Sequence, residues 1–255
     1  MPLGCKNRRP RVNLTQWVTK VTYVWLLRDY INEMENEALS SPEMKDYEYG
    51  YGLAYRLAGE QLAKVDDIEQ QCLKSGAQYQ VIDSKKTIIV EYLNQSYRVT
   101  LPDVEISLIG SQEKVPVKDR ILILHYLTQA KGTPSSNKLI AYKELPEGSS
   151  YFPTFSKRAI KPLVDHFGQE PHRLVDAAEK LGGRRVDYGD VAVTINAFSR
   201  VPITLVLWRG DEEFPPEGNI IFDSTISDYL TTEDINVLCE VIAWRLVKFL
   251  KARGD

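Results

Sequence analysis

The chain has 255 residues, 43% of them hydrophobic and 26% charged, with a formal net charge of −3. A chain of this length can bury a core without disulfides or metal ions, and the composition is too apolar for a disordered protein. A net charge near zero excludes the global basic field that binds nucleic acid by releasing counterions, so we expect a folded protein with no nucleic-acid partner.

The cysteines are too few and too far apart to form a local metal or redox motif. Cys5, Cys72 and Cys239 contain no CxxC pair, which excludes a zinc knuckle or an iron-sulfur ligand set within the chain. Reduced thiols of this kind are typical of a cytoplasmic protein, which is the location that we expect.

Residues 1–46 are interpreted as an N-terminal extension, partly helical or disordered, ahead of a globular domain at 47–255. The apolar run Val21–Leu27 follows the basic segment KNRRPR. Seven residues cannot span a bilayer, which needs about 20, and no small-residue cleavage site follows the run. A surface amphipathic helix, or an extension that arises from an upstream start codon, explains this segment better than a signal peptide does.

The globular part is predicted to open with a helix. Apolar residues recur at roughly helical spacing from Tyr49 to Lys74, and Gly76 provides a C-terminal stop. Short β-rich runs follow, namely YQVI, KTIIVEYL, QSYRVTL and VEISLI, and they predict an antiparallel meander with a tight hairpin at Asn94-Gln95.

The next segment, RILILHYLTQAKG, predicts a helix that is capped by Asp119 and ends at Gly132. It contains His125 among leucines. No second histidine lies three or four residues away, so we interpret His125 as a core or boundary histidine with one hydrogen-bond partner rather than a metal ligand.

A loop, the run KLIAYKELP and the turn EGSSYFP lead to two short helices. One is expected around Ser156–Phe167, and the other opens at Pro171 and stops at Gly182-Gly183. His166 and His172 flank the turn between them. Two imidazoles there could approach a metal ion or a tetrapyrrole metal, but no carboxylate is spaced to orient both rings.

Three strands are predicted at Asp187–Ala197, Val201–Trp208 and Asn219–Phe222 from their β-branched and aromatic content. The middle strand, ITLVLW, is nearly all apolar, so it should be buried on both faces in the centre of a sheet. Pro202 should then lie at its first residue or at a bulge, because proline cannot donate to the ladder.

Carboxylates follow these strands. If the last two strands are neighbours, Asp211 or Glu213 can lie near Asp223. Such a cluster could coordinate Mg²⁺ or Ca²⁺, or share a proton for acid-base chemistry. The simpler interpretation is a polar turn whose acids are solvated, capped or paired with Arg184, Arg185, Arg200 or Arg209, and we favour it.

The chain is predicted to end in a helix capped by Thr231, with Glu233 and Asp234 in its first turn, that runs to about Ala252. Cys239 lies beside its apolar stripe and is interpreted as a small core residue. Taken together, the elements predict an α+β fold with a mostly antiparallel sheet packed with several helices, in one main domain.

The segments ELPEGSSYFPTF, GDVAVTI, VPITLVLWRGDEEFP, NIIFD and YLTTEDI resemble a prokaryotic family, domain of unknown function 3786. The resemblance covers about residues 47–250 and implies no established activity. It implies a setting in anaerobic bacteria and archaea, where some relatives resemble fusions to a four-cysteine iron-sulfur module. This chain lacks those cysteines, so an electron-transfer role would need a separate redox protein partner.

The leading functional hypothesis is a non-catalytic binding or accessory module whose ligand lies against Trp208, Asp211, Glu213, Asp223 and Tyr229. The anaerobic setting that the resemblance implies suggests a tetrapyrrole or corrinoid-type cofactor. Two alternatives stay open. One is a metal-dependent hydrolase or transferase that uses the carboxylate cluster, although the chain has no HExxH, GxxxxGK[ST] or GxSxG motif. The other is a protein-interaction scaffold, suggested by 14 tyrosines.

Overall fold

The computed structural model describes residues 42–252. The chain divides into two compact units, Met1–Ala54 and Tyr55–Asp255. Helix α2, Pro42–Ala63, contains the described residues of the first unit and the first residues of the second. The predictions for the basic arm, for the apolar run at 21–27 and for Cys5 lie outside the described residues. Within 42–252 no helix has the length and apolar character needed to cross a membrane.

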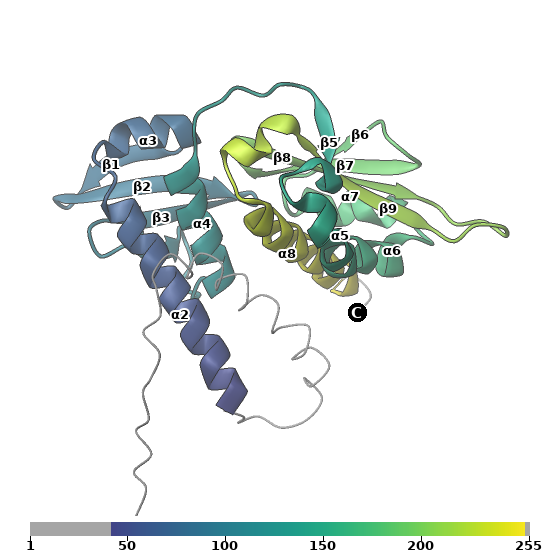
Figure 1. Ribbon diagram of the computed structural model, residues 1–255, viewed down its shortest axis with the longest axis horizontal. Helices are drawn as coiled ribbons and strands as arrows, with labels where there is room; N and C mark the ends of the chain where they lie inside the picture. Colours follow the sequence, from purple (N-terminus) through teal and green to yellow (C-terminus); the bar gives the residue numbers. More distant parts are fainter. Residues whose placement is uncertain (1–41, 253–255) are drawn as a thin grey trace, which may run out of the picture. The chain divides into compact units, whose positions relative to one another are not determined.

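The second unit is an α+β structure built on an antiparallel sheet of nine strands, as predicted. It consists of two lobes, which we define as residues 55–130 and 139–252 (Figure 1). The first lobe contains the end of α2, then α3 (Ile68–Ser75), β1 (Gln78–Ile82), β2 (Lys85–Tyr92), β3 (Gln95–Thr100), β4 (Glu105–Leu108) and α4 (Val117–Gln129). The second lobe contains β5 (Leu139–Ala141), α5 (Gly148–Phe155), α6 (Lys161–Phe167), α7 (His172–Glu179), β6 (Arg184–Val186), β7 (Val191–Phe198), β8 (Val201–Trp208), β9 (Glu217–Asp223) and α8 (Thr232–Lys251).

The first lobe differs from the prediction in having two helices where one was expected. The break lies at 64–67, because the Asp67 side chain accepts a hydrogen bond from the Gln70 amide at 2.9 Å and caps a new helix. Gly76 ends α3 in the left-handed conformation (φ 71°), as predicted. The meander β1–β4 is antiparallel, and its tight hairpin loop is Leu93-Asn94, one residue earlier than predicted, with φ of 49° and 62°.

Asp119 does not cap α4, and this prediction was wrong. The helix begins three residues earlier than predicted, at Val117, with Pro116 in the cap position. Asp119 instead lies in the first turn, 2% exposed, where it accepts a hydrogen bond from the Tyr92 hydroxyl at 2.8 Å. An unpaired charge is strongly disfavoured in the protein interior, so a buried carboxylate must be hydrogen-bonded or ion-paired. Asp119 therefore binds these partners instead of capping the helix.

Strand β8 lies between β7 and β9 in the second lobe and is buried on both faces, as predicted. Thr204, Leu205 and Val206 are 6%, 0% and 2% exposed. Pro202 is paired with Asn196 at the position where the β7–β8 register shifts, which confirms the expected bulge.

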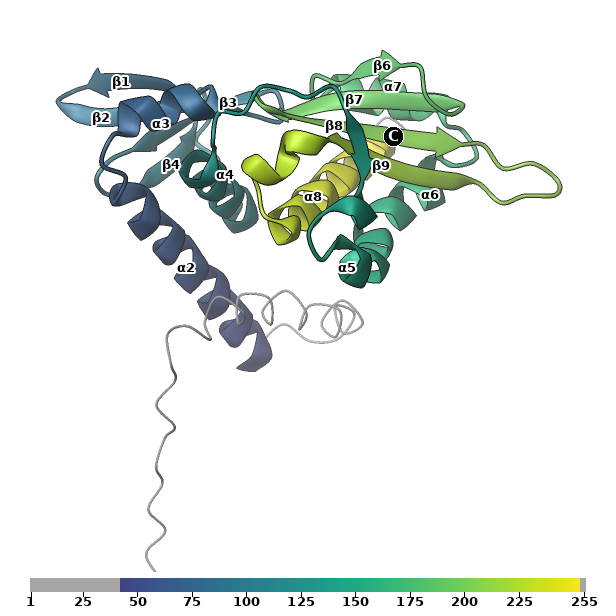
Figure 2. The ribbon, with the colours of Figure 1, turned by 45° about the horizontal axis from the view of Figure 1, so that its top comes forward.

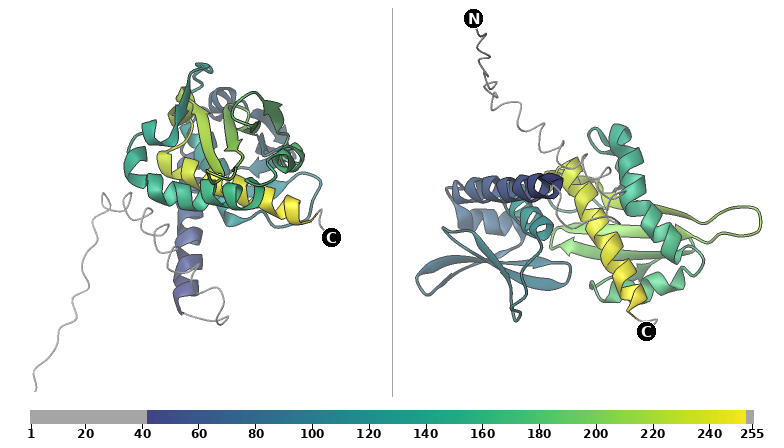
Figure 3. Two further views of the ribbon diagram at one scale, coloured as in Figure 1. Left: turned by 90° about the vertical axis from the view of Figure 1, so that its right-hand side faces the viewer. Right: turned by 90° about the horizontal axis from the view of Figure 1, so that it is seen from below.

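The helices of the second lobe gather mainly against one side of the β7–β9 strands, with α8 and the α5–α6 segment side by side (Figure 3). The expected EGSSYFP turn is instead helix α5, which continues through a π-helical turn at Ser156–Ile160 into α6. Thr231 caps α8 in a capping box with Asp234, as predicted. Cys239 is 0% exposed in the core, and burial raises the pKa of its thiol.

The two lobes meet where β2 pairs with β7, in the middle of the strand order of the sheet, and along α4 and α8. Tyr92 of β2 pairs with Phe198 of β7, so the sheet continues from one lobe into the other. The rings of Tyr126 and Phe198 stack there with centroids 4.0 Å apart, and the Tyr92 ring lies 4.9 Å from the Phe198 ring. These fully buried aromatic rings supply much of the apolar surface that holds the lobes together.

Candidate functional site

The residues of the predicted site fall at opposite ends of the β8–β9 pair. Trp208 is opposite Glu217, whereas Ile203 is opposite Phe222, because the strands run antiparallel. Asp211 and Glu213 follow the end of β8, while Asp223 ends β9 beside the beginning of β8. At 3.4 Å per residue the two ends are about 20 Å apart. The prediction that these carboxylates share one edge was therefore wrong.

Asp223 holds the segment 131–138, which connects the lobes, against the end of β9. Its carboxylate accepts hydrogen bonds from Ser135 Oγ (2.6 Å), Ser136 Oγ (2.9 Å), Asn137 N (2.9 Å) and Thr225 Oγ1 (2.7 Å). Burial acts to raise the pKa of Asp223, but these hydrogen bonds outweigh it and hold the pKa well below its usual range. Both carboxylate oxygens are engaged by the protein itself.

Tyr229, the other predicted residue at this end, also belongs to this connection. It is 1% exposed, and its hydroxyl donates a hydrogen bond to the Thr133 carbonyl. Asp228 accepts from Lys131 Nζ and Thr133 Oγ1, each at 2.8 Å. We refer to residues 131–138 with these contacts as the strap. Hydrogen bonds with Asp223, Asp228 and Tyr229 fix the strap in place.

A recess lies at the other end of the strand pair, beyond Trp208. It has a volume of about 460 Å³, which is within the range of small-molecule sites. Its polar lining comes from three separate places in the chain: the start of α7, the residue before β7 and the loop after β8. Figure 2 shows the strands β7, β8 and β9 side by side. The lining residues are Pro171, His172, Asp190, Val191, Arg209, Gly210 and Asp211.

Strand pairing explains why these segments converge. Val191 at the start of β7 pairs with Leu207 near the end of β8, so Asp190 and Arg209 are neighbours. The Arg209 amide donates to Asp190 Oδ2 at 2.8 Å. The turn before α7 is held close to the β8–β9 loop, because a Cβ on Gly168 would lie only 2.7 Å from Pro216 Cβ. The Asp190 carboxylate is thus held by the backbone just after β8, and His172 is the first residue of α7.

Asp211 is oriented by the loop that follows it. Its Oδ1 accepts from the amides of Glu213 and Phe214, both at 2.8 Å, and its own amide donates to the Phe214 carbonyl at 2.9 Å. The hydrogen bonds from Phe214 and Glu213 lower the pKa of Asp211, so its carboxylate is charged at neutral pH. Glu213 itself contributes its backbone to this loop and is exposed.

The recess combines groups of opposite charge. Arg209 offers a planar guanidinium that pairs bidentately with carboxylate or phosphate. His172 supplies an imidazole, a metal ligand or hydrogen-bond partner. Asp190 and Asp211 supply carboxylates held in position by backbone amides. This set suits a ligand with both acidic groups and hydrogen-bond donors.

Three exposed aromatic side chains lie within three residues of the lining residues in the chain. Tyr188, Trp208 and Phe214 are 47%, 41% and 67% exposed. Gly189 has φ +55°, and a Cβ at this position would lie 2.7 Å from Val206 Cγ1 and 3.3 Å from Trp208 Cε2. Glycine is therefore required for this turn to pack against Trp208, which places Tyr188 and Trp208 in one patch.

The two histidines of the predicted helical turn have different surroundings. His172 lines the recess. His166 shares a hydrogen bond at 2.9 Å between its Nδ1 and the Pro162 carbonyl, and its ring lies edge-on to Trp244. Among residues 42–252 no group of three or more His, Cys, Asp and Glu side chains is placed to hold a metal ion.

The sequence interpretation missed Asp190 as a site residue, and it treated Arg209 only as a neutralising charge. A signal for both was present. Once the runs before and after Ser199-Arg200 are read as a hairpin, the start of the first strand must meet the end of the second. The antiparallel pairing therefore predicts that Asp190 lies next to Arg209. It does not predict that α7 lies beside them.

A family model described as a domain of unknown function (DUF3786) matches residues 67–245. This match covers most of both lobes, including the strap and every residue that lines the recess. A search of curated proteins and a search of solved structures found no match. The physical properties of the site are therefore the basis for its interpretation.

Proposed function

The chain belongs to the family of domain of unknown function 3786, and from its site we propose that it is a non-catalytic binding module that takes up a small molecule in the recess beyond β8. One observation carries the proposal. Arg209, His172 and two oriented carboxylates converge on a recess of about 460 Å³ from three segments. Sites for small molecules typically combine such a concavity with a few well-placed polar groups.

A tetrapyrrole or corrinoid-type cofactor is the ligand class that we propose to test first. Acidic side groups on the ring of a tetrapyrrole would pair with Arg209, and the imidazole of His172 would bind its metal. The exposed aromatic rings of Trp208 and Phe214, which precede and follow the lining residues Arg209–Asp211 in the chain, would offer flat surfaces to such a ligand. These features favour a flat ligand with peripheral acids over a compact one.

We expect haemin to bind the full-length protein and Arg209→Gln to weaken this binding about 10- to 100-fold, the usual value of one charge-assisted hydrogen bond. His172→Ala should change the visible spectrum of the complex, because it removes the proposed ligand of the metal. The measurement is a spectroscopic titration with haemin, and in parallel with cobalamin, combined with thermal shift.

Arg173→Gln is the matched control, since Arg173 is adjacent to His172 but pairs with Glu170 at 3.0 Å and does not line the recess. Wild-type protein that shows no spectral or thermal change with either compound would remove the tetrapyrrole ligand. Equal weakening by Arg209→Gln and Arg173→Gln would instead remove the recess as the place of binding.

The aromatic patch favours a second function, a scaffold that binds another protein. Tyr188, Trp208 and Phe214 form an exposed apolar surface beside charged groups, as the centres of protein interfaces often do. A redox protein partner is one candidate.

We expect Trp208→Ala with Phe214→Ala to abolish capture of a partner from an anaerobic lysate. Trp244→Ala should leave capture unchanged, because Trp244 is similarly exposed but lies on α8. Capture that survives the double substitution would contradict the scaffold function.

The metal-dependent alternative gains no support from the geometry. Its three proposed ligands, Asp211, Glu213 and Asp223, do not lie together. A hard cation such as Mg²⁺ needs several oxygen ligands at one place.

A further inference from the structure

Helices α4 and α8 form a contact between the two lobes, which we call the seam. Three charged pairs cross it. Lys118 Nζ lies 3.5 Å from Glu240 Oε1, Arg245 Nη2 lies 2.6 Å from Asp119 Oδ2, and His125 Nδ1 lies 2.7 Å from Asp234 Oδ1. The beginning of α4 meets the later part of α8 and its end meets the beginning of α8, so the helices are antiparallel. Of the three pairs, only the last contains a group that titrates near neutral pH.

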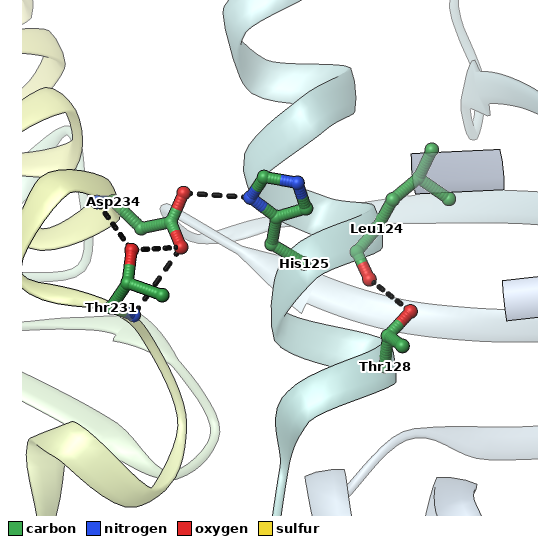
Figure 4. Close-up of polar contacts among 5 residues, drawn as sticks. All are labelled: Leu124, His125, Thr128, Thr231 and Asp234. Atoms are coloured by element: carbon green, nitrogen blue, oxygen red, sulfur yellow. Dashed lines mark hydrogen bonds and ion pairs between the residues drawn. The ribbon is translucent and has the colours of Figure 1, made fainter. Parts of the chain in front are cut away.

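The carboxylate partner of His125 has a fixed position. Asp234 is 6% exposed, and its second oxygen accepts hydrogen bonds from Thr231 Oγ1 at 2.7 Å and from the Thr231 amide at 3.3 Å. Figure 4 shows the His125 ring directed across the seam toward this capping box. The cap of α8 therefore orients the carboxylate, and the carboxylate in turn orients the imidazole.

The charges around His125 are negative. Asp234 and Glu233, both on α8, are the charged groups that act on it among the described residues. On its own helix the nearest charged side chain is Arg120, five residues earlier, whose guanidinium lies over the Tyr55 ring at 4.3 Å. Helix α2 contacts α4 through this neutral Tyr55 ring. Helix α3 also packs on α4 and contributes the neutral Gln71, whose side chain donates a hydrogen bond to the Leu127 carbonyl.

These surroundings favour the protonated ring. Burial acts to lower the pKa of His125, but the Asp234 charge and its hydrogen bond outweigh it and raise the pKa above 6.5, with Glu233 adding to the effect. Burial likewise acts to raise the pKa of Asp234, and the His125 charge lowers it below its usual value.

We propose that the His125–Asp234 pair is a pH-sensitive clasp that holds the two lobes together while His125 is protonated and loosens the seam when His125 becomes neutral. A neutral ring can still donate one hydrogen bond from Nδ1 to Asp234, so deprotonation removes the charge attraction and keeps the contact. Deprotonation would weaken one of the three charged pairs that cross the seam, so the seam would open more often without unfolding of either lobe.

The pH window follows from the direction of the shift. A histidine whose pKa is raised by folding contributes stability that is fully present below its unfolded pKa of 6.5 and is lost as the pH rises through its folded pKa. Each unit that separates the two values changes the opening equilibrium of the seam by about tenfold. We therefore expect the change to begin above pH 6.5 and to be complete one to two units above the folded pKa.

Two measurements on the full-length protein test the clasp. In the first, NMR follows the titration of the three histidine rings, with the His125 signal identified by its absence in His125→Gln. In the second, amide hydrogen exchange of α4 and α8 is measured from pH 6 to pH 9 and corrected for the intrinsic exchange rate. We expect His125 to titrate above 6.5 and the opening of the seam to rise with pH in wild type and in His166→Gln, but not in His125→Gln.

Either of two results would overturn the proposal. One is a His125 ring that titrates at or below 6.5. The other is a pH dependence of seam opening that is the same in His125→Gln as in wild type. Assigning the other two histidine signals with His166→Gln and His172→Gln identifies His125 by elimination, so the first result decides the question even if His125→Gln does not fold.

Discussion

Replacing Arg245 with methionine is expected to lower the free energy of unfolding by about 3–5 kcal/mol, the usual loss when a buried ion pair is broken from one side. Asp119 is 2% exposed, and its carboxylate accepts hydrogen bonds from Arg245 Nη2 at 2.6 Å and from the Tyr92 hydroxyl at 2.8 Å. Methionine keeps most of the aliphatic stem and removes the charge, which leaves the buried carboxylate with the hydroxyl alone. Urea unfolding of wild type and variant measures the difference.

The double variant Asp119→Leu with Arg245→Met tests the cause of this loss. Replacing both members of a buried pair by apolar groups is often close to neutral, so we expect it to recover most of the stability that Arg245→Met loses. Lys161→Met is the matched control, because Lys161 and Asp165 form an exposed pair at 2.8 Å that should contribute no more than about 1 kcal/mol. A double variant as unstable as Arg245→Met would show that packing, rather than the unpaired charge, causes the loss.

The elements that the sequence predicted well have a strong local cause. Their structure follows from residues that are close together in the chain. Examples are the apolar run that forms β8, the glycine that ends α3 and the threonine that caps α8. Boundaries failed where a distant partner decides the role of a residue. Aspartate is frequent at helix N-caps, which is why Asp119 was predicted to be one. It is instead bound in the first turn of α4 by Tyr92 and Arg245, which are 27 and 126 residues away in the chain.

The candidate site depends on strand direction, which residue composition does not reveal. Asp211 and Asp223 were predicted to be neighbours because each follows an apolar strand. In an antiparallel pair, however, the ends of successive strands point in opposite directions. The same rule brings Asp190 to Arg209, and only the packing of the α6–α7 turn on Pro216 adds His172. That last contact has no local signal in the sequence.

Replacing Asp223 with alanine is expected to destabilise the protein by about 2–4 kcal/mol, since the substitution leaves several donors of the strap and of Thr225 without their charged acceptor. Its carboxylate is 5% exposed and accepts from Ser135, Ser136 and Asn137 on the strap. Thermal or urea unfolding measures the loss, and limited proteolysis within 131–138 should become faster, because the segment is held mainly by these contacts.

The pH dependence of this effect separates a structural carboxylate from a ligand-binding one. The pKa of Asp223 is lowered by folding, so its contribution is present above the unfolded pKa of about 3.8 and is lost as the pH falls through the folded value. The difference between wild type and Asp223→Ala should therefore be constant from pH 5 to pH 8 and shrink in acid.

Asp228→Ala is the matched control for the strap, because Asp228 bonds Lys131 and Thr133 with a side chain that is 31% exposed. We expect it to cost no more than about 1 kcal/mol. If Asp223→Ala were as mild as Asp228→Ala and instead abolished a heat of Mg²⁺ binding seen with wild type, the carboxylate would be a metal ligand rather than the anchor of the strap. Both of its oxygens already accept hydrogen bonds from the protein, which is why we expect the calorimetric traces of wild type and variant to be the same.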